Sequence, residues 1–207
     1  IAANPHFSDD APGGIRIVDT NNDGSLTPED RVALGTPYPD FTWGITNTFQ
    51  IKDFDISFLI QGVQGITVLN GDVYYNETKK WNKKYTKNRW VSAEHPGDGK
   101  TPYQNVKTGH DLMLTDYPLQ NASYACLRNF TVGYTLPATA ARKIKLSGVR
   151  FYVSGSNLLY IWGSGYKGIN PESRMTSGNY SSAMISGYQR GGFPLTSTIS
   201  AGFDINF

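Results

Sequence analysis

Residues 41–61, which decide the fold, read FTWGITNTFQIKDFDISFLIQ. Apolar side chains recur at every second position over 43–51, interrupted at Asn47, and again over 54–60. Successive side chains of a β-strand point to opposite faces, so this alternation is typical of strands with one apolar and one polar face. The stretch predicts two strands joined by a tight turn at residues 52–53.

Three further segments alternate in the same way, over residues 129–136, 149–162 and 199–207. In the last of them, for example, Phe203 alternates with Asp204. The polar faces carry Thr, Ser, Asn, Gln and Gly more than Lys and Glu. The sequence therefore predicts an all-β fold built from about five or six long antiparallel strands.

A soluble β-sandwich also alternates, but three features favour a transmembrane β-barrel. The strands approach the ~9–11 residues that a membrane-spanning strand requires. Their polar faces suit the wall of a lumen. Aromatic residues lie at strand ends, where barrels carry interfacial girdles; these residues are Trp43, Tyr134, Tyr160 and Trp162. A transmembrane helix is excluded because the sequence has no run of ~18 apolar residues.

The connections between the predicted strands alternate in length. Residues 52–53 and 137–147 form short connections, whereas 66–120 and 163–194 are long, polar and rich in Tyr, Gly and Asn. Outer-membrane barrels have short periplasmic turns and long extracellular loops. If the chain ends in the periplasm, every connection falls on the expected side. We expect the aromatic residues of the long loops either to contact substrate or a partner or to pack within the loops themselves.

Composition narrows the function classes. A formal net charge of +2 argues against a nucleic-acid partner. The single cysteine, Cys126, excludes a disulfide within the chain and a cysteine-based metal site. No nucleophile arrangement, nucleotide-binding loop or acid pair stands at a credible spacing, so we expect no enzyme activity.

Residues 19–30, DTNNDGSLTPED, have the spacing of a calcium-binding loop, and a strand is expected just before them over 15–18. In such loops oxygen ligands at positions one, three, five, seven, nine and twelve wrap a hard cation, and glycine at position six permits the sharp turn. The predicted ligands are Asp19, Asn21, Asp23, Ser25, Thr27 and Asp30. Asp30 replaces the usual glutamate, so it would bind through one oxygen or through water. The alternative is an Asn/Asp/Gly-rich turn held by side-chain-to-backbone hydrogen bonds.

Several blocks of the sequence resemble the last strands of SusC/RagA-type TonB-dependent transporters, in order and over nearly the whole chain. They are GTPYPDFTWG at 35–44, FDISFLIQG at 54–62, ASYACLRNFTVGYTLP at 122–137, VRFYVSGSNL at 149–158, GINPE at 168–172 and FPLTSTISAGFDINF at 193–207. The calcium-type loop belongs to the same resemblance. The chain departs from the family pattern at Cys126, where a larger polar or basic residue is expected, and at Asn170, which often is Asp.

The resemblance implies a bacterial outer-membrane protein with a large barrel of about 22 strands. It divides the chain into an extracellular loop with the calcium-type motif (1–40) and the C-terminal barrel strands and loops (41–207). The N-terminal plug and the segment that contacts TonB would lie outside this sequence. Five strands cannot close a barrel, whose minimum is about eight, so they must pair with strands supplied elsewhere.

The same resemblance implies TonB-dependent uptake of an oligosaccharide or peptide, delivered beneath a SusD-like surface lipoprotein. Two alternatives stay open at this point. One is a secreted, calcium-stiffened β-sandwich that binds glycan and transports nothing, and the other is a passive porin.

Overall fold

The computed structural model describes residues 5–6, 10–72, 88–103, 114–173 and 187–207. Its main feature is one antiparallel sheet of five long strands in the order β1-β2-β5-β6-β8. They are β1 (Phe41–Ile51), β2 (Phe54–Gln64), β5 (Tyr124–Thr135), β6 (Gly148–Trp162) and β8 (Thr198–Asn206). The five predicted strands are thus confirmed, with β5 beginning five residues earlier than the alternation indicated.

The register places most of the alternating apolar side chains of the five strands on one face. One row across the sheet joins five partners near the short turns: Ile51, Phe54, Tyr134, Phe151 and Phe203. The rings of Phe54 and Tyr134 lie 4.8 Å apart between centroids, as cross-strand aromatic pairs do. The face is uncovered: Ile45 is 53% exposed and Phe203 65%. A sandwich would bury this face beneath a second sheet.

The opposite face is polar and irregular at one place. The pairing of β5 with β2 skips Arg128, and the pairing of β5 with β6 shifts at the same point. Asn157, across the shift on β6, adopts a positive φ of 55°. A bulge of this kind re-aims side chains. Here it directs Arg128 toward the polar face, where its partners lie.

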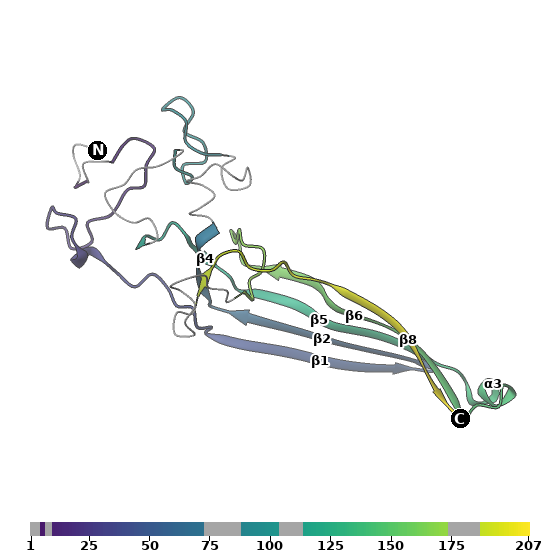
Figure 1. Ribbon diagram of the computed structural model, residues 1–207. Helices are drawn as coiled ribbons and strands as arrows, with labels where there is room; N and C mark the ends of the chain where they lie inside the picture. The colour runs from purple at the N-terminus through teal and green to yellow at the C-terminus, as the bar shows by residue number, and fades with distance from the viewer. Residues whose placement is uncertain (1–4, 7–9, 73–87, 104–113, 174–186) are drawn as a thin grey trace.

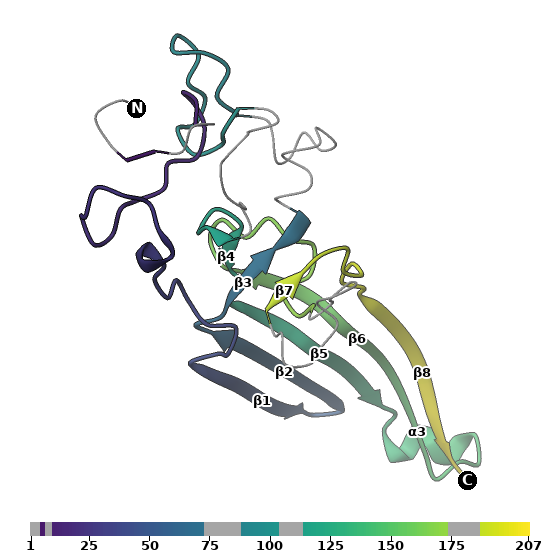
Figure 2. The ribbon, with the colours of Figure 1, turned by 60° about the vertical axis from the view of Figure 1, so that its left-hand side comes forward.

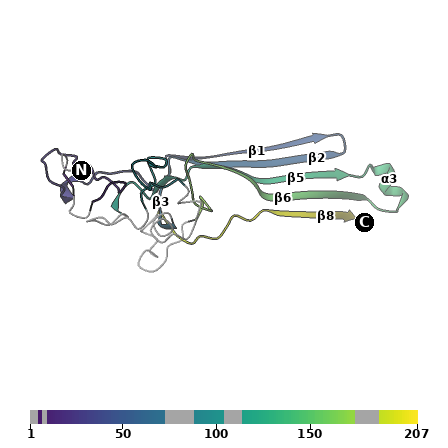
Figure 3. The same cartoon turned by 90° about the horizontal axis from the view of Figure 1, so that it is seen from above.

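The two ends of the sheet differ. The turn after β1, the connection that holds α3 (Ala138–Lys143) and the C-terminus lie at one end, and the long connections lie at the other (Figure 1). Figure 3 shows the same division from above, with the sheet extended between the two ends. The alternation of short and long connections expected from the sequence is therefore realised in space.

A second, small sheet lies among the long connections (Figure 2). Its order is β4 (Leu119–Asn121), β3 (Thr67–Asn70) and β7 (Tyr188–Gln189), with β3 and β7 parallel. A buried apolar cluster forms there from Ile66, Val68, Ala122 and Tyr166. These strands were not predicted from the sequence, because two to four residues are too few to show alternation.

Other sequence expectations need correction. The 137–147 connection contains the helix α3, which was not predicted. Residues 15–18 do not form the expected strand; the regular element in that region is the 3-10 helix η1 (Pro28–Asp30). Tyr160 pairs with Cys126 and Trp162 with Tyr124, so both lie on the polar face and take no part in an aromatic girdle on the apolar face. Across the described ranges, no helix is long and apolar enough to span a membrane.

Candidate functional site

The polar face of the five-stranded sheet carries an ion-pair group close to the short turns. Arg150 of β6 donates from Nε to Asp55 Oδ1 at 3.0 Å and from Nη2 to Asp55 Oδ2 at 2.7 Å. It also donates from Nη1 to Asp204 Oδ2 at 3.2 Å. Two parallel bonds from one guanidinium to one carboxylate fix orientation as well as distance.

A glycine makes this contact possible. Asp55 lies on β2 and Arg150 on β6, so the pair reaches across β5 at Gly133. A Cβ at Gly133 would lie 2.6 Å from both Arg150 Nη2 and Asp55 Oδ2. The ion pair therefore occupies the space that a side chain at position 133 would fill.

A second polar group lies at the bulge, nearer the long loops. Arg128 pairs with Glu172, which belongs to the connection between β6 and β7. The Arg128 Nη1 donates to Asn157 Oδ1 at 2.7 Å and to Tyr160 Oη at 2.9 Å, and the guanidinium lies 5.8 Å from the Tyr160 ring centroid. The group ties a long connection to the wall of the sheet.

Buried hydrogen bonds hold the remaining loops to one another. Tyr166 Oη donates to Gln189 Oε1 at 2.7 Å, and Gln189 Nε2 donates to the Ser173 carbonyl at 2.8 Å. The buried Asn70 donates from Nδ2 to Gln120 Oε1 at 3.0 Å. Buried amides with satisfied partners specify one arrangement of the chain. The long connections thus form an ordered structure around the small sheet, here called the loop end.

Asn170, which departs from the family pattern, has a role that aspartate cannot fill. Its Oδ1 accepts from the Glu172 N–H at 2.9 Å, while its Nδ2 donates to the Phe193 carbonyl at 3.1 Å. A carboxylate has no such donor. Cys126, the other departure, is a buried free thiol on β5.

The calcium-type loop is stabilised by hydrogen bonds from its backbone N–H groups to its own side-chain oxygens. Asp19 Oδ2 accepts from the Gly24 N–H at 2.9 Å, and Asp23 Oδ1 accepts from the Ser25 N–H at 2.8 Å. Asn21 Oδ1 accepts from the Asp23 N–H at 3.0 Å, so three predicted ligands act as turn acceptors. Gly24 has a φ of 85°, which is the left-handed conformation expected at position six of the motif.

The last predicted ligands form a helix cap. The Thr27 side chain accepts a hydrogen bond from the Glu29 N–H, and the Asp30 carboxylate accepts one from the Thr27 N–H, which completes a capping box. Asp30 Oδ1 also accepts from the Thr20 N–H at 2.8 Å. The N–H groups of Thr27 and Thr20 hold the pKa of Asp30 below its ordinary value.

The six predicted ligands lie in one loop, and Asp19 Oδ1 and Asn21 Oδ1 both accept from the Asp23 N–H, at 3.3 Å and 3.0 Å. In the part of the chain that the structure describes, no three His, Cys, Asp or Glu side chains form a group that could hold a metal ion. Calcium binding stays a prediction. Each carboxylate oxygen has about two lone pairs, so an oxygen that accepts one N–H can still bind a cation.

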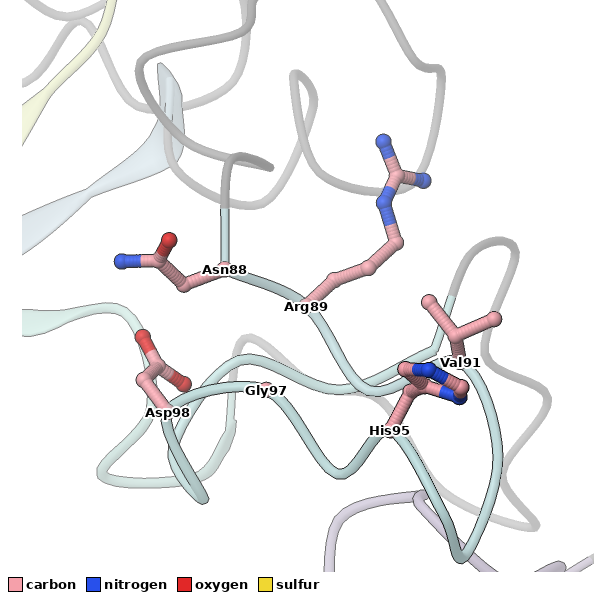
Figure 4. Close-up of a pocket in the computed structure, with 6 residues that line it drawn as sticks. All are labelled: Asn88, Arg89, Val91, His95, Gly97 and Asp98. Carbon is pink, nitrogen blue, oxygen red and sulfur yellow. The ribbon is translucent and has the colours of Figure 1, made fainter.

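Hollows open at the end of the sheet that carries the long connections. One, of about 620 Å³, lies between the calcium-type loop and Leu114–Asp116, with Ile17, Leu26 and Val32 among its apolar residues. Another, of about 420 Å³, is shown in Figure 4: Asn88 and Asp98 lie on one side, with His95 and Val91 on the other, and Arg89 points away from Asp98. Among the loop aromatics considered for substrate contact, Tyr166 and Tyr188 are buried. The tyrosines at 74, 75 and 180 lie outside the described residues.

Comparison with known proteins gives one consistent result. TonB-dependent receptor P3 of Formosa agariphila is 30% identical over 206 residues, which are 96% of this chain and 19% of that receptor. TonB-dependent receptor SusC of Bacteroides thetaiotaomicron is 27% identical over 157 residues, which are 75% of this chain and 15% of that receptor. The chain belongs to the TonB-dependent receptors of the SusC/RagA type.

Solved structures of this receptor type share the fold. The RagAB peptide transporter superposes with a TM-score of 0.66 at 21% identity, over 84% of this chain and 18% of that chain. The RagAB peptide importer in its open-open state gives a TM-score of 0.61. No protein-family profile matches the chain. The chain spans about a fifth of the length of the curated relatives it matches.

These relatives and the fold bear on three expectations from the sequence: enzyme activity, the barrel and the β-sandwich. The SusC/RagA-type relatives are receptors and transporters, so the prediction that the chain is no enzyme is confirmed. The prediction of a partial transmembrane barrel is confirmed as well, and the exposed apolar face is the side that meets lipid in such a barrel. The β-sandwich is wrong, because the face that it would bury is uncovered.

Proposed function

We propose that this chain forms part of the wall and external mouth of an outer-membrane importer that is driven by TonB. The observation that carries the proposal is the continuous apolar face on five paired strands, joined to a polar face with internal ion pairs. β1 has 11 residues. At roughly 3.3 Å per residue and a tilt of about 45°, such a strand covers about 25 Å, the height of the apolar band of such barrels.

The substrate is proposed to be an oligosaccharide or a peptide that enters beneath a SusD-like surface lipoprotein. Support comes from the relatives, one of which is SusC and another the RagAB peptide transporter. The built loop end supports the same proposal. A partner or substrate that meets a preformed surface has less ordering entropy to offset on binding.

The test is uptake by cells that carry the whole receptor. We expect uptake of the accepted substrate class to stop when TonB is deleted or when the proton gradient is collapsed. Uptake that continues at the same rate without TonB would indicate a passive porin instead. Comparing labelled peptides with labelled oligosaccharides in the same cells decides the substrate class.

We also propose that residues 19–30 bind Ca²⁺ and stiffen an external loop. The spacing of oxygen ligands and the left-handed Gly24 support this proposal. The carboxylates of Asp19 and Asp23 also accept backbone N–H groups, which fixes the turn that carries them. Extracellular loops of this class bind in the range of 10⁻⁴–10⁻³ M, so even a weak site fills outside the cell.

A further inference from the structure

The short connection that holds α3 presents an unusual surface at the end of the sheet away from the long loops (Figure 1). Residues 137–147 include Arg142, Lys143 and Lys145 but no Asp or Glu. All three cations are exposed, as is Ile144 between them, at 57%. Within the described ranges none of the three forms an ion pair with a carboxylate.

The backbone holds these cations in a fixed arrangement. Lys145 has a positive φ of 60°, and the Leu146 N–H donates to the Ala141 carbonyl at 3.1 Å, as in a Schellman-type helix end. The helix dipole explains basic residues in the last turn of α3. It does not explain Lys145 beyond the helix, or why an isoleucine between cations is left in solvent.

The connection lies next to the aromatic row of the apolar face. Pro137, the N-cap of α3, follows Tyr134 of that row by three residues, which is roughly 10 Å of extended chain. The headgroup region of a bilayer begins at the edge of the apolar band and is about 5–8 Å thick. On a strand tilted by about 45°, those roughly 10 Å are about 7 Å along the membrane normal, so α3 begins at headgroup depth.

We propose that Arg142, Lys143 and Lys145 bind the anionic headgroups of phospholipids in the leaflet next to the short turns. Ile144 inserts among the adjoining acyl chains. An exposed apolar residue flanked by cations at an interface is the arrangement that binds anionic bilayers. The contact fixes the depth of the barrel wall at that end. This inference rests on the proposed membrane function and adds a lipid partner to it.

The experiment uses the whole receptor purified in detergent, with lipid binding followed by native mass spectrometry. The titrants are phosphatidylglycerol, phosphatidylcholine with the same acyl chains, and inorganic phosphate. The test variant is R142Q/K143Q/K145Q. The matched control, R16Q/R31Q/K100Q, removes the same charge from exposed positions outside the α3 connection.

We expect the wild type and the control to prefer phosphatidylglycerol. Since each cation near an anionic surface strengthens binding about fivefold, the test variant should bind it on the order of a hundredfold more weakly at low salt. Equal affinities in the two triple variants would overturn the proposal. Complete displacement of the lipid by inorganic phosphate would also overturn it, because the site would then take small anions.

Two further measurements keep the outcome clear. If the triple variant does not fold, K143Q and K145Q are tested singly, and the wild type is titrated at about 1 M salt, where exposed charges are screened. A wild-type receptor that takes up substrate by a TonB-dependent route but binds both lipids equally contradicts this inference alone. Failure of TonB-dependent uptake contradicts the proposed function instead.

Discussion

Replacing Gly133 by alanine tests the account of the polar face. The added Cβ would lie 2.6 Å from Arg150 Nη2 and from Asp55 Oδ2, closer than carbon atoms approach such groups. Both contacts are flexible side-chain ends, so the expected response is a broken ion pair and not a displaced strand. The side chains of Arg150 and Asp55 are each 31% exposed, which limits the pair to about 1 kcal/mol.

A double-mutant cycle isolates this energy from the general effect of replacing glycine. Alanine at a compatible position stabilises by about 0.4–1 kcal/mol through the unfolded chain, and this contribution is the same with or without Asp55. In the Asp55→Ala background the added Cβ has no carboxylate to displace. The coupling between the two substitutions is therefore expected to be about 1 kcal/mol, or about fivefold in the constant for local opening.

The assay is hydrogen–deuterium exchange on the whole receptor, with a peptide that covers residues 129–136. Gly148→Ala is the matched control, because a Cβ there would approach only Asn206, at 3.4 Å and 3.9 Å. We expect Gly133→Ala to accelerate exchange about fivefold more in the wild type than in the Asp55→Ala background. The same factor in both backgrounds would refute the role assigned to this glycine.

Three other predictions address the apolar face and the calcium-type loop. Ile45→Lys puts a charge near the middle of the lipid-facing side, so it should cost about 2–4 kcal/mol of folding free energy and lower the amount of folded receptor in membranes. Thr46→Lys on the polar face should not lower that amount. Equal amounts of folded receptor by heat-modifiability on gels would contradict the assignment of Ile45 to the lipid-facing side. Joint replacement of Asp19 and Asp23 by alanine should abolish bound calcium by elemental analysis while insertion stays normal, and unchanged calcium would exclude the site. Asp30 has a lowered pKa, so its stabilisation of the loop is fully present above the ordinary value of 3.8 and is lost as pH falls through the folded-state pKa. Proteolysis of the loop should therefore become faster at acid pH. The Asp30→Asn substitution should remove this pH dependence.

The sequence predicted the long strands because their side chains alternate over enough residues to be unambiguous. It also predicted the two ends of the sheet, since connection length separates turns from loops. It did not predict the ion pair between Asp55 and Arg150, which are 95 residues apart in sequence. That contact depends on the register that brings Gly133 between them. A charged residue on the polar side of β2, β6 and β8 was the available signal.

The loop end was less predictable for a physical reason. Gln120 and Gln189 look like ordinary polar loop residues in the sequence, yet both are buried in hydrogen-bond networks. Burial of an amide is decided by partners that lie far away along the chain. The bulge at Arg128 was hidden as well, because one extra residue in a strand leaves only a local break in the alternation.

The central claim is that the five strands cross a membrane with the long loops on one side and α3 on the other. Single cysteines at exposed positions Ala93 and Thr139, in a receptor with Cys126 replaced by alanine, report this directly with a membrane-impermeant maleimide. We expect labelling at 93 in intact cells, and labelling at 139 only after the outer membrane is permeabilised. Equal labelling of both positions in intact cells would contradict it.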